Sequence, residues 1–230
     1  MKGILWTKYG FEFLSIFIAV VAAFALENWR DNQRDTLAAD KILVEIYNGL
    51  EKDLEDVHIN IIGHEAGLNA CTFWRKAISG QDVVSDSSAF HYLNLTRDFI
   101  NVQNSSGYET LKSRGLELIT NDSLRTQIIS LYEYDYSALR KLEEEYDEVA
   151  FQKSYFDQFN KYIAPHFQFD EQGGIRGIRQ PLTISEQDRN LLLSYLWKIE
   201  VNRQFMLRLY RATEEKINAL RQSIQKELNH

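Results

Sequence analysis

The chain contains very little proline and cysteine. Its 230 residues include only two prolines, Pro165 and Pro181, and a single cysteine, Cys71. Because proline interrupts helices, a chain with so little of it can form very long ones. One cysteine excludes an internal disulfide and a zinc site built from several thiolates. We expect Cys71 to be a buried small hydrophobe rather than a nucleophile.

Basic residues are also scarce. The chain has 26 Lys and Arg against 33 Asp and Glu, a net charge of −7, and no long run of basic residues. Nucleic-acid binding needs a basic footprint, so no nucleic-acid partner is expected. Part of the acidic excess lies in one stretch that we interpret as a solvated helix face: Glu143, Glu144, Glu145, Asp147 and Glu148.

One long apolar run stands near the N-terminus. Residues 13–26 contain no charge, and extending the run back to Tyr9 gives about eighteen residues, or ~27 Å of helix, close to the thickness of a bilayer's hydrocarbon core. Trp6 before the run and Trp29 after it are placed as interfacial anchors. The sequence therefore predicts a membrane anchor over residues 1–29, with the transmembrane part at about 9–26 and the lipid bilayer as partner.

A cleavable signal peptide is the alternative, because Ala23-Phe24-Ala25 offers a site of the small-x-small type. However, the chain continues into Glu27-Asn28-Trp29-Arg30 without a turn residue, as a continuing helix would. This favours an uncleaved anchor.

Glu12 is a carboxylate inside the apolar run, a costly position that is a functional candidate by default. Lys8 lies four residues earlier, which favours a snorkelling or ion-paired Glu12 at the interface. The alternative is a contact with another membrane helix, or a proton-linked role. Gly10 and the small residues of the run could let such a helix approach closely. Basic residues flank the run almost equally, so charge does not decide the orientation.

Helical spacing of apolar residues continues through most of the remaining chain. We predict a domain over residues 30–230 with helices at about 30–79, 86–100 plus 106–119, 121–164 and 184–228, and a loop at 166–182. Capping patterns at Ser106-x-x-Glu109 and Ser185-x-x-Asp188 support two of these starts. The predicted fold is all-α: an N-terminal transmembrane helix that continues into an elongated antiparallel three- or four-helix bundle with long, coiled-coil-like helices.

Four polar or small residues mark the junction near residue 120. Gly115 permits close packing, and Asn121 can satisfy free amides at a helix start. Together with Ser113 and Arg125 they predict a structural corner. The alternative is that Ser113 or Arg125 binds an anion near that helix terminus.

Two clusters carry a resemblance to a known family: Gly10-x-Glu12 with Asn28-Trp29, and Tyr108-x-x-Leu111-x-Ser113-x-Gly115 followed by Leu118-Ile119-x-Asn121-x-x-Leu124-Arg125 and Tyr132. The chain resembles an uncharacterised bacterial family of small proteins with one N-terminal transmembrane helix and a helical soluble domain. The resemblance implies no catalytic residues and no cofactor. It implies a single-pass protein of the bacterial inner membrane, with the soluble domain on the periplasmic side. The basic N-terminal tail of that family is reduced here to Lys2 and Lys8.

Catalytic motifs are not recognisable. Glu55-x-x-His58 matches half of a di-iron site, but the chain has no second Glu-x-x-His. Arg176 and Arg179 on a glycine-containing loop could grip an anion, although a hairpin loop is the simpler interpretation. We therefore expect a non-enzymatic scaffold or accessory subunit without cofactor or metal, which acts through a homo-oligomer or another membrane protein. The alternative is an extracytoplasmic ligand-sensing bundle that signals through a partner membrane protein.

Overall fold

The structure is a computed structural model that describes the backbone of residues 3–229 and the side chains of residues 10–229. The chain is 80% helical with 3% strand, which confirms the all-α class. The main elements in chain order are α1 (Gly3–Ile78), α2 (Ser88–Leu95), α3 (Ser106–Arg114), α4 (Asp122–Ile129), α5 (Tyr136–Glu145), α6 (Phe151–Ile163), β1 (Phe167–Phe169), β2 (Ile175–Ile178) and α7 (Glu186–Leu228).

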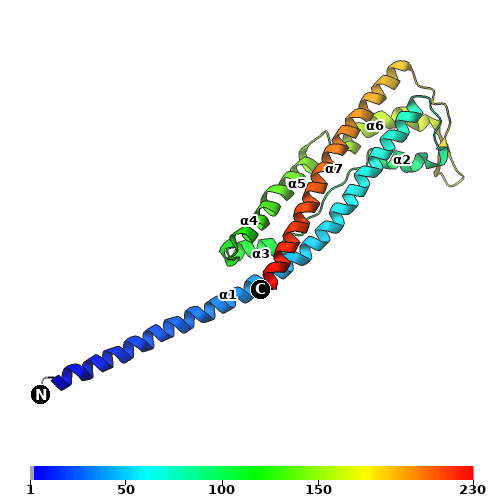
Figure 1. Ribbon diagram of the computed structural model, residues 1–230. Coiled ribbons are helices and arrows are strands. Elements are labelled where there is room, and N and C mark those ends of the chain that lie inside the picture. Colours follow the sequence, from blue (N-terminus) through cyan, green and yellow to red (C-terminus); the bar gives the residue numbers. More distant parts are fainter. Residues whose placement is uncertain (1–2, 230) are drawn as a thin grey trace.

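Helix α1 is one uninterrupted helix of 76 residues. At 1.5 Å per residue it is about 114 Å long, and its first part projects from the domain as a bare arm (Figure 1). Among the side chains that the structure describes, the first buried one on α1 is that of Ile42. The predicted continuity of the apolar helix with the first helix of the domain is therefore confirmed. The helix ends with Gly80 at φ +77°, a conformation that glycine adopts at little cost.

Helix α7 packs along the distal half of α1 in the opposite direction (Figure 1). Arg75 pairs with Glu200 near one end, and Glu51 pairs with Arg221 near the other, at 3.6 Å. The order of these pairs shows the antiparallel direction. The apolar stripes predicted from helical spacing form the buried interface, with Leu43, Ile46, Leu50, Val57, Ile61 and Trp74 on α1 and Leu192, Leu196, Ile199, Met206, Ile217, Leu220 and Ile224 on α7.

The prediction of one continuous helix over residues 121–164 is wrong. It is divided into α4, a π-helical segment Ser130–Asp135, α5 and α6, with a non-helical break between Glu145 and Phe151. Tertiary contacts replace the missing helical hydrogen bonds at the break. The amide of Asn202 on α7 donates to the Glu148 carbonyl at 3.1 Å, and the backbone N–H of Gln152 donates to Asp98 at 3.2 Å. No proline or glycine marks this break in the sequence.

Two other predicted boundaries are also wrong. The helix expected over 86–100 ends at Leu95, and the one expected over 106–119 ends at Arg114. Residues 96–105 instead form an irregular segment, here termed the connector, between α2 and α3. Ser106 does not form the predicted capping box, because its hydroxyl donates to Asn104 Oδ1 at 2.9 Å.

The predicted loop at 166–182 contains a short β-hairpin at the end of the domain far from the N-terminus (Figure 1). Strands β1 and β2 pair antiparallel, with Phe167 opposite Ile178. Ser85 fastens the hairpin to the α1–α2 loop: the Ile178 backbone N–H donates to Ser85 Oγ at 2.9 Å, and the Ser85 hydroxyl donates to the Ile178 carbonyl at 3.0 Å. The capping of α7 by Ser185, which accepts from the Asp188 N–H, is confirmed.

Candidate functional site

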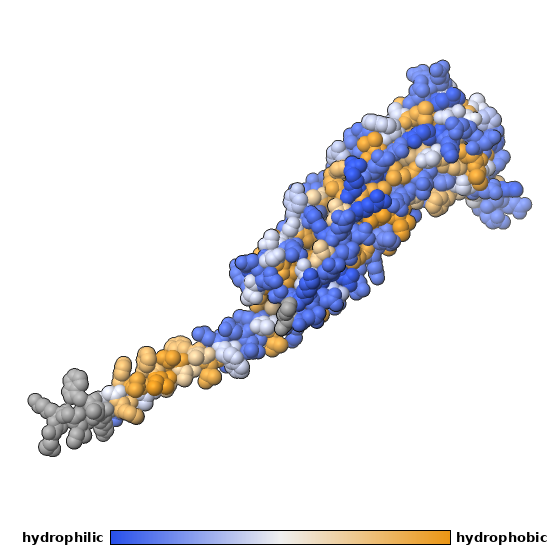
Figure 2. Space-filling model, viewed as in Figure 1, coloured by the Kyte–Doolittle hydropathy of each residue, from blue (hydrophilic) through white to orange (hydrophobic). Residues whose placement is uncertain are grey.

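The first candidate is the exposed apolar segment of α1 over residues 10–26, here termed the apolar arm. Its most apolar eighteen-residue window has a mean hydropathy of 2.0 and is 0% buried. Figure 2 shows this arm as a continuous hydrophobic rod beside a mostly hydrophilic domain. An exposed apolar surface of this length is far larger than the patches that monomeric soluble proteins tolerate. The helix is thus long and apolar enough to cross a membrane, by length and composition.

The apolar arm has two different faces. Helical spacing places Glu12, Ser15, Ala19 and Ala23 along one side, because these residues are three to four positions apart. Phe13, Phe17 and Phe24 lie on another side, and the rings of Phe13 and Phe17 are 6.3 Å apart between centroids. Between Glu12 and Ala23, the side chains on one side of the helix are therefore small, apart from the carboxylate at its start, whereas those on the other side are bulky. We term the first side the small face.

The predicted group of Glu12, Gly10 and Lys8 is only partly brought together. Gly10 lies about 160° around the helix from Glu12, so it is not on the small face. No heavy atom lies within 4 Å of a Cβ built on Gly10. The side chains of Lys8 and Trp6 fall outside the described residues, although their backbone belongs to α1. Trp29 follows the apolar run and is 63% exposed.

The predicted corner is built around two hydrogen bonds at the start of α4. Asn121 is the N-cap, and its side-chain oxygen accepts from the Leu124 backbone N–H at 3.2 Å. Arg125 donates to the Ile119 carbonyl at 2.9 Å and pairs with Asp122. The arginine therefore has structural partners already, which favours the corner over the anion site.

The other two corner residues lie at the end of α3. Gly115 has φ +107°, a backbone conformation that residues with a side chain rarely adopt, and it ends the helix. The Ser113 hydroxyl donates to the Thr110 carbonyl at 2.8 Å within the helix. Across the corner, the Asn121 amide donates to Glu227 at 2.7 Å and thereby ties α4 to the end of α7.

A fully buried arginine lies where α2 ends. Arg203 of α7 is 0% exposed, and its Nη2 donates to the carbonyl oxygens of Asn94, Leu95 and Arg97 at 3.2, 2.9 and 3.0 Å. Gly67 of α1 makes room for it, since a Cβ at Gly67 would lie 2.3 Å from Arg203 Nε. The arginine occupies carbonyl groups that would otherwise continue α2, which explains why that helix stops at Leu95.

His64 of α1 lies beside this arginine. Arg203 Nη1 is 3.3 Å from His64 Nδ1, and burial together with the arginine charge lowers the pKa of His64 to about 3. The imidazole is therefore neutral, with Nδ1 as acceptor and the proton on Nε2. This Nε2 is buried and has no hydrogen-bond partner among the described residues. His64 also lines a cavity of about 70 Å³ together with Asp98, Phe99, Glu143 and Met206, among others.

Carboxylates from α1 and α5 hold the connector. Three of its backbone N–H groups each donate to one carboxylate: Asn101 to Glu143 at 3.1 Å, Val102 to Asp56 at 2.9 Å and Asn104 to Asp53 at 2.7 Å. Because the connector is neither helix nor strand, these groups lack the usual backbone partners, and the carboxyl oxygens accept their hydrogen bonds instead. The interpretation of Glu143 as part of a solvated face is wrong, since it is half-buried and bonded to the connector.

Burial makes two of these carboxylates unusually basic. Desolvation raises the pKa of Asp53 to about 6, although the Asn104 N–H and the Tyr136 hydroxyl partly oppose the shift. Desolvation likewise raises the pKa of Glu143 to about 7, against donors from Tyr210 and Asn101. Both groups therefore change charge close to neutral pH, unlike ordinary surface carboxylates.

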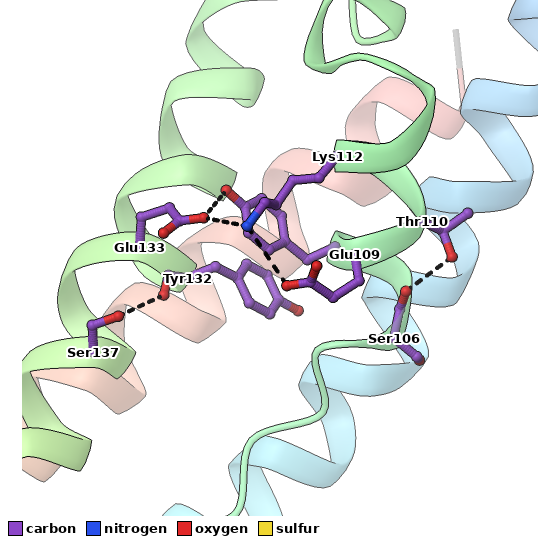
Figure 3. A network of polar contacts seen from close by, with 8 residues as sticks. Ser106, Glu109, Thr110, Lys112, Tyr132, Glu133 and Ser137 are labelled. Carbon is purple, nitrogen blue, oxygen red and sulfur yellow. Dashed lines mark hydrogen bonds and ion pairs between the residues drawn. The ribbon is translucent and has the colours of Figure 1, made fainter.

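A more exposed network lies where α3 faces the π-helical segment (Figure 3). Glu133 accepts from the Tyr108 hydroxyl at 2.9 Å and from the Lys112 ammonium at 3.0 Å, and Lys112 also lies 3.7 Å from Glu109. The Lys112 and Tyr108 hydrogen bonds lower the pKa of Glu133. The Tyr108 and Tyr132 rings stack with centroids 4.5 Å apart. Since exposed ion pairs add little stability, the stacked rings and the buried core are the main attachment of α3.

Three further residues considered from the sequence, His58, Cys71 and Arg179, have structural surroundings that explain them. His58 is largely exposed and faces Glu214 of α7 at 3.9 Å. Within the described part of the chain, no group of three or more His, Cys, Asp or Glu is placed to hold a metal ion. Burial raises the pKa of Cys71 to about 12, which leaves it a poor nucleophile. Arg179 donates to the Pro165 carbonyl at 2.7 Å and thereby closes the hairpin.

Sequence reasoning missed the connector and the side chains that hold it. A signal was present, because Arg203 stands between Ile199 and Met206 on the apolar stripe of α7. Asp53 stands in the same way between Leu50 and Val57 on α1. A charged residue at a position that helical spacing buries needs a specific partner.

Comparison of the chain with protein-family models, with curated proteins and with solved structures finds no match.

Proposed function

We propose that the chain is a non-enzymatic, single-pass membrane protein whose helical domain acts as a scaffold or accessory subunit through protein–protein contact. The observation that supports this most is the apolar arm of α1, which is fully exposed and continues without interruption into the domain. A bilayer would cover the arm, and the unbroken helix would hold the domain rigidly above it. The domain would stand as an elongated antiparallel three- or four-helix bundle around the α1–α7 pair.

The small face supplies the partner contact in this proposal. Membrane helices associate through small residues that let backbones approach, and a polar side chain on that face adds an interhelical hydrogen bond. Ser15, Ala19 and Ala23 meet the first condition and Glu12 the second. The partner is a second copy of the chain or another membrane protein, and Glu12 would hydrogen-bond across the contact.

The proposed location is the bacterial inner membrane, with the domain on the periplasmic side. The resemblance of the Glu12 and Asn28-Trp29 cluster to the family of small single-pass proteins supports this, whereas the charges flanking the apolar run are nearly balanced. Protease added to intact spheroplasts tests the orientation. Digestion of the domain before lysis supports the periplasmic side, and protection until lysis contradicts it.

The partner contact is tested by mild detergent extraction of the full-length chain, followed by light scattering and mass spectrometry of co-purifying proteins. Ala19→Leu adds bulk to the small face, and Val21→Leu adds bulk to the opposite side as a matched control. We expect the wild type and V21L to retain an oligomer or a defined partner, and A19L to lose it. A monomeric wild type without any partner would contradict the proposal.

A second candidate function is ligand sensing by the domain, with signalling through a partner membrane protein. The observation that favours it is the cavity beside His64, which Asp98 and Glu143 also line. Its volume of about 70 Å³ admits only water-sized groups. A search for organic ligands by thermal-shift screening should therefore find none that stabilises the domain through this cavity.

A further inference from the structure

Glu143 holds together three parts of the domain. It belongs to α5, accepts the Asn101 N–H of the connector at 3.1 Å, and accepts the hydroxyl of Tyr210 on α7. It also lines the cavity of about 70 Å³ that His64 and Asp98 border. One carboxyl group thus links the connector, α5 and α7.

The cavity leaves room for water beside this carboxyl group. A polar cavity of this size holds about two water molecules when it offers hydrogen-bond partners. The Nε2–H of His64, buried and without a partner among the described residues, is such a donor, and the carboxylates of Asp98 and Glu143 are acceptors. Protons can therefore reach Glu143 without unfolding of the domain.

We infer that Glu143 is a proton-binding site, and that loss of its proton loosens the connector between α2 and α3. When the Glu143 carboxyl group is protonated, its C=O oxygen accepts the Asn101 N–H, and its O–H group forms the hydrogen bond with the Tyr210 hydroxyl. After ionisation, the half-buried charge is better solvated when the connector moves away and water enters. This regulatory property goes beyond the proposed function and does not depend on the membrane partner.

The charged groups around Glu143 also favour its protonated form. Asp56 of α1 and Glu144 of α5 both repel its ionised form, and burial raises its pKa to about 7. Across the cavity, Asp98 of the connector is acidic and His64 is neutral. The guanidinium of Arg203 on α7 is directed to the backbone carbonyls at the end of α2 instead. Ionised Glu143 is thus left with hydrogen bonds but without a compensating positive charge among these neighbours.

Hydrogen–deuterium exchange on the full-length protein in mild detergent tests the inference. Exchange of peptides covering residues 96–105 is measured at pH 6, 7 and 8, corrected for intrinsic rates, under conditions where the opening equilibrium limits exchange. The variant is Glu143→Gln, which mimics the protonated group, and the control is Glu145→Gln, an exposed residue on the same helix. His64 and Asp53 also contribute to the pH dependence in both proteins. The informative quantity is therefore the opening equilibrium constant of the wild type divided by that of the variant.

We expect the opening equilibrium constant of the connector in the wild type, divided by that in E143Q, to rise about ten-fold between pH 6 and pH 8. Proton linkage requires this rise for a carboxyl group with such a raised pKa. The ratio of wild type to E145Q should stay within about two-fold. A constant ratio for E143Q overturns the inference. Should E143Q fail to fold, a carbon-13 titration of the Glu143 carboxyl in the wild type decides. A midpoint near 7 supports the inference, and an ordinary carboxyl midpoint contradicts it.

Discussion

The guanidinium of Arg203 lies 4.2 Å from the centroid of the Phe151 ring, so a buried cation of α7 rests on the first residue of α6. The same guanidinium binds the carbonyl groups that end α2. One side chain therefore joins α7, α6 and the start of the connector. Since a buried charge is costly unless it is well paired, the domain depends on these contacts more than on its surface ion pairs.

Replacing Arg203 with Met should destabilise the domain by about 3 kcal/mol, because three carbonyl groups, among them that of buried Leu95, lose their donor. Urea unfolding in mild detergent, followed by circular dichroism, measures the effect. Arg208→Met is the matched control, since Arg208 is exposed on the same helix and should change stability by less than about 0.5 kcal/mol. Equal effects of the two variants would show that the buried contacts contribute little.

Replacing Gly67 with Ala should also destabilise the domain, although alanine is the better helix former. The new Cβ would lie 2.3 Å from Arg203 Nε and would push the guanidinium away from its carbonyl partners. We expect a loss of about 1–3 kcal/mol by the same unfolding measurement. Thr72→Ala, at an exposed site on α1, serves as the control. If G67A were more stable than the wild type, the Arg203 side chain would not occupy the space beside residue 67.

The pH dependence of stability should carry a contribution from Asp53 with a defined sign. Its pKa is raised from the ordinary aspartate value of 3.8 to about 6, so the folded protein binds more protons than the unfolded chain between these values. The free energy of unfolding therefore falls as pH rises from about 4 to 6, and this loss is complete above the folded pKa. His64, with a lowered pKa, has the opposite dependence between about pH 3 and 6.5.

The difference between wild type and Asp53→Asn separates the two groups. Relative to the variant, the wild type should lose on the order of 1–2 kcal/mol between pH 4 and pH 7, because Asn does not titrate. Unfolding curves at several pH values supply the measurement. A difference that stays constant over this range would refute the assignment of a raised pKa to Asp53.

The long elements of this protein are predictable from sequence, because apolar residues at helical spacing specify α1 and α7 and neither helix contains proline. The divided region after Asn121 is not, since its apolar spacing continues through the break at Tyr146–Ala150. That break depends on partners distant in the chain, such as Asp98 and Asn202. The connector is hidden for the same reason. Only Arg203 and Asp53, charged residues on apolar stripes, indicate from sequence that a buried polar arrangement exists.

We propose that the apolar arm of α1 remains in the protein and anchors it in a bilayer. Alkaline carbonate extraction of membranes from cells expressing the full-length chain, with intact-mass measurement of the product, tests this most directly. We expect the protein in the membrane pellet, at the mass of the uncleaved 230-residue chain. Release into the soluble fraction, or a product shortened near Ala25, would contradict the account.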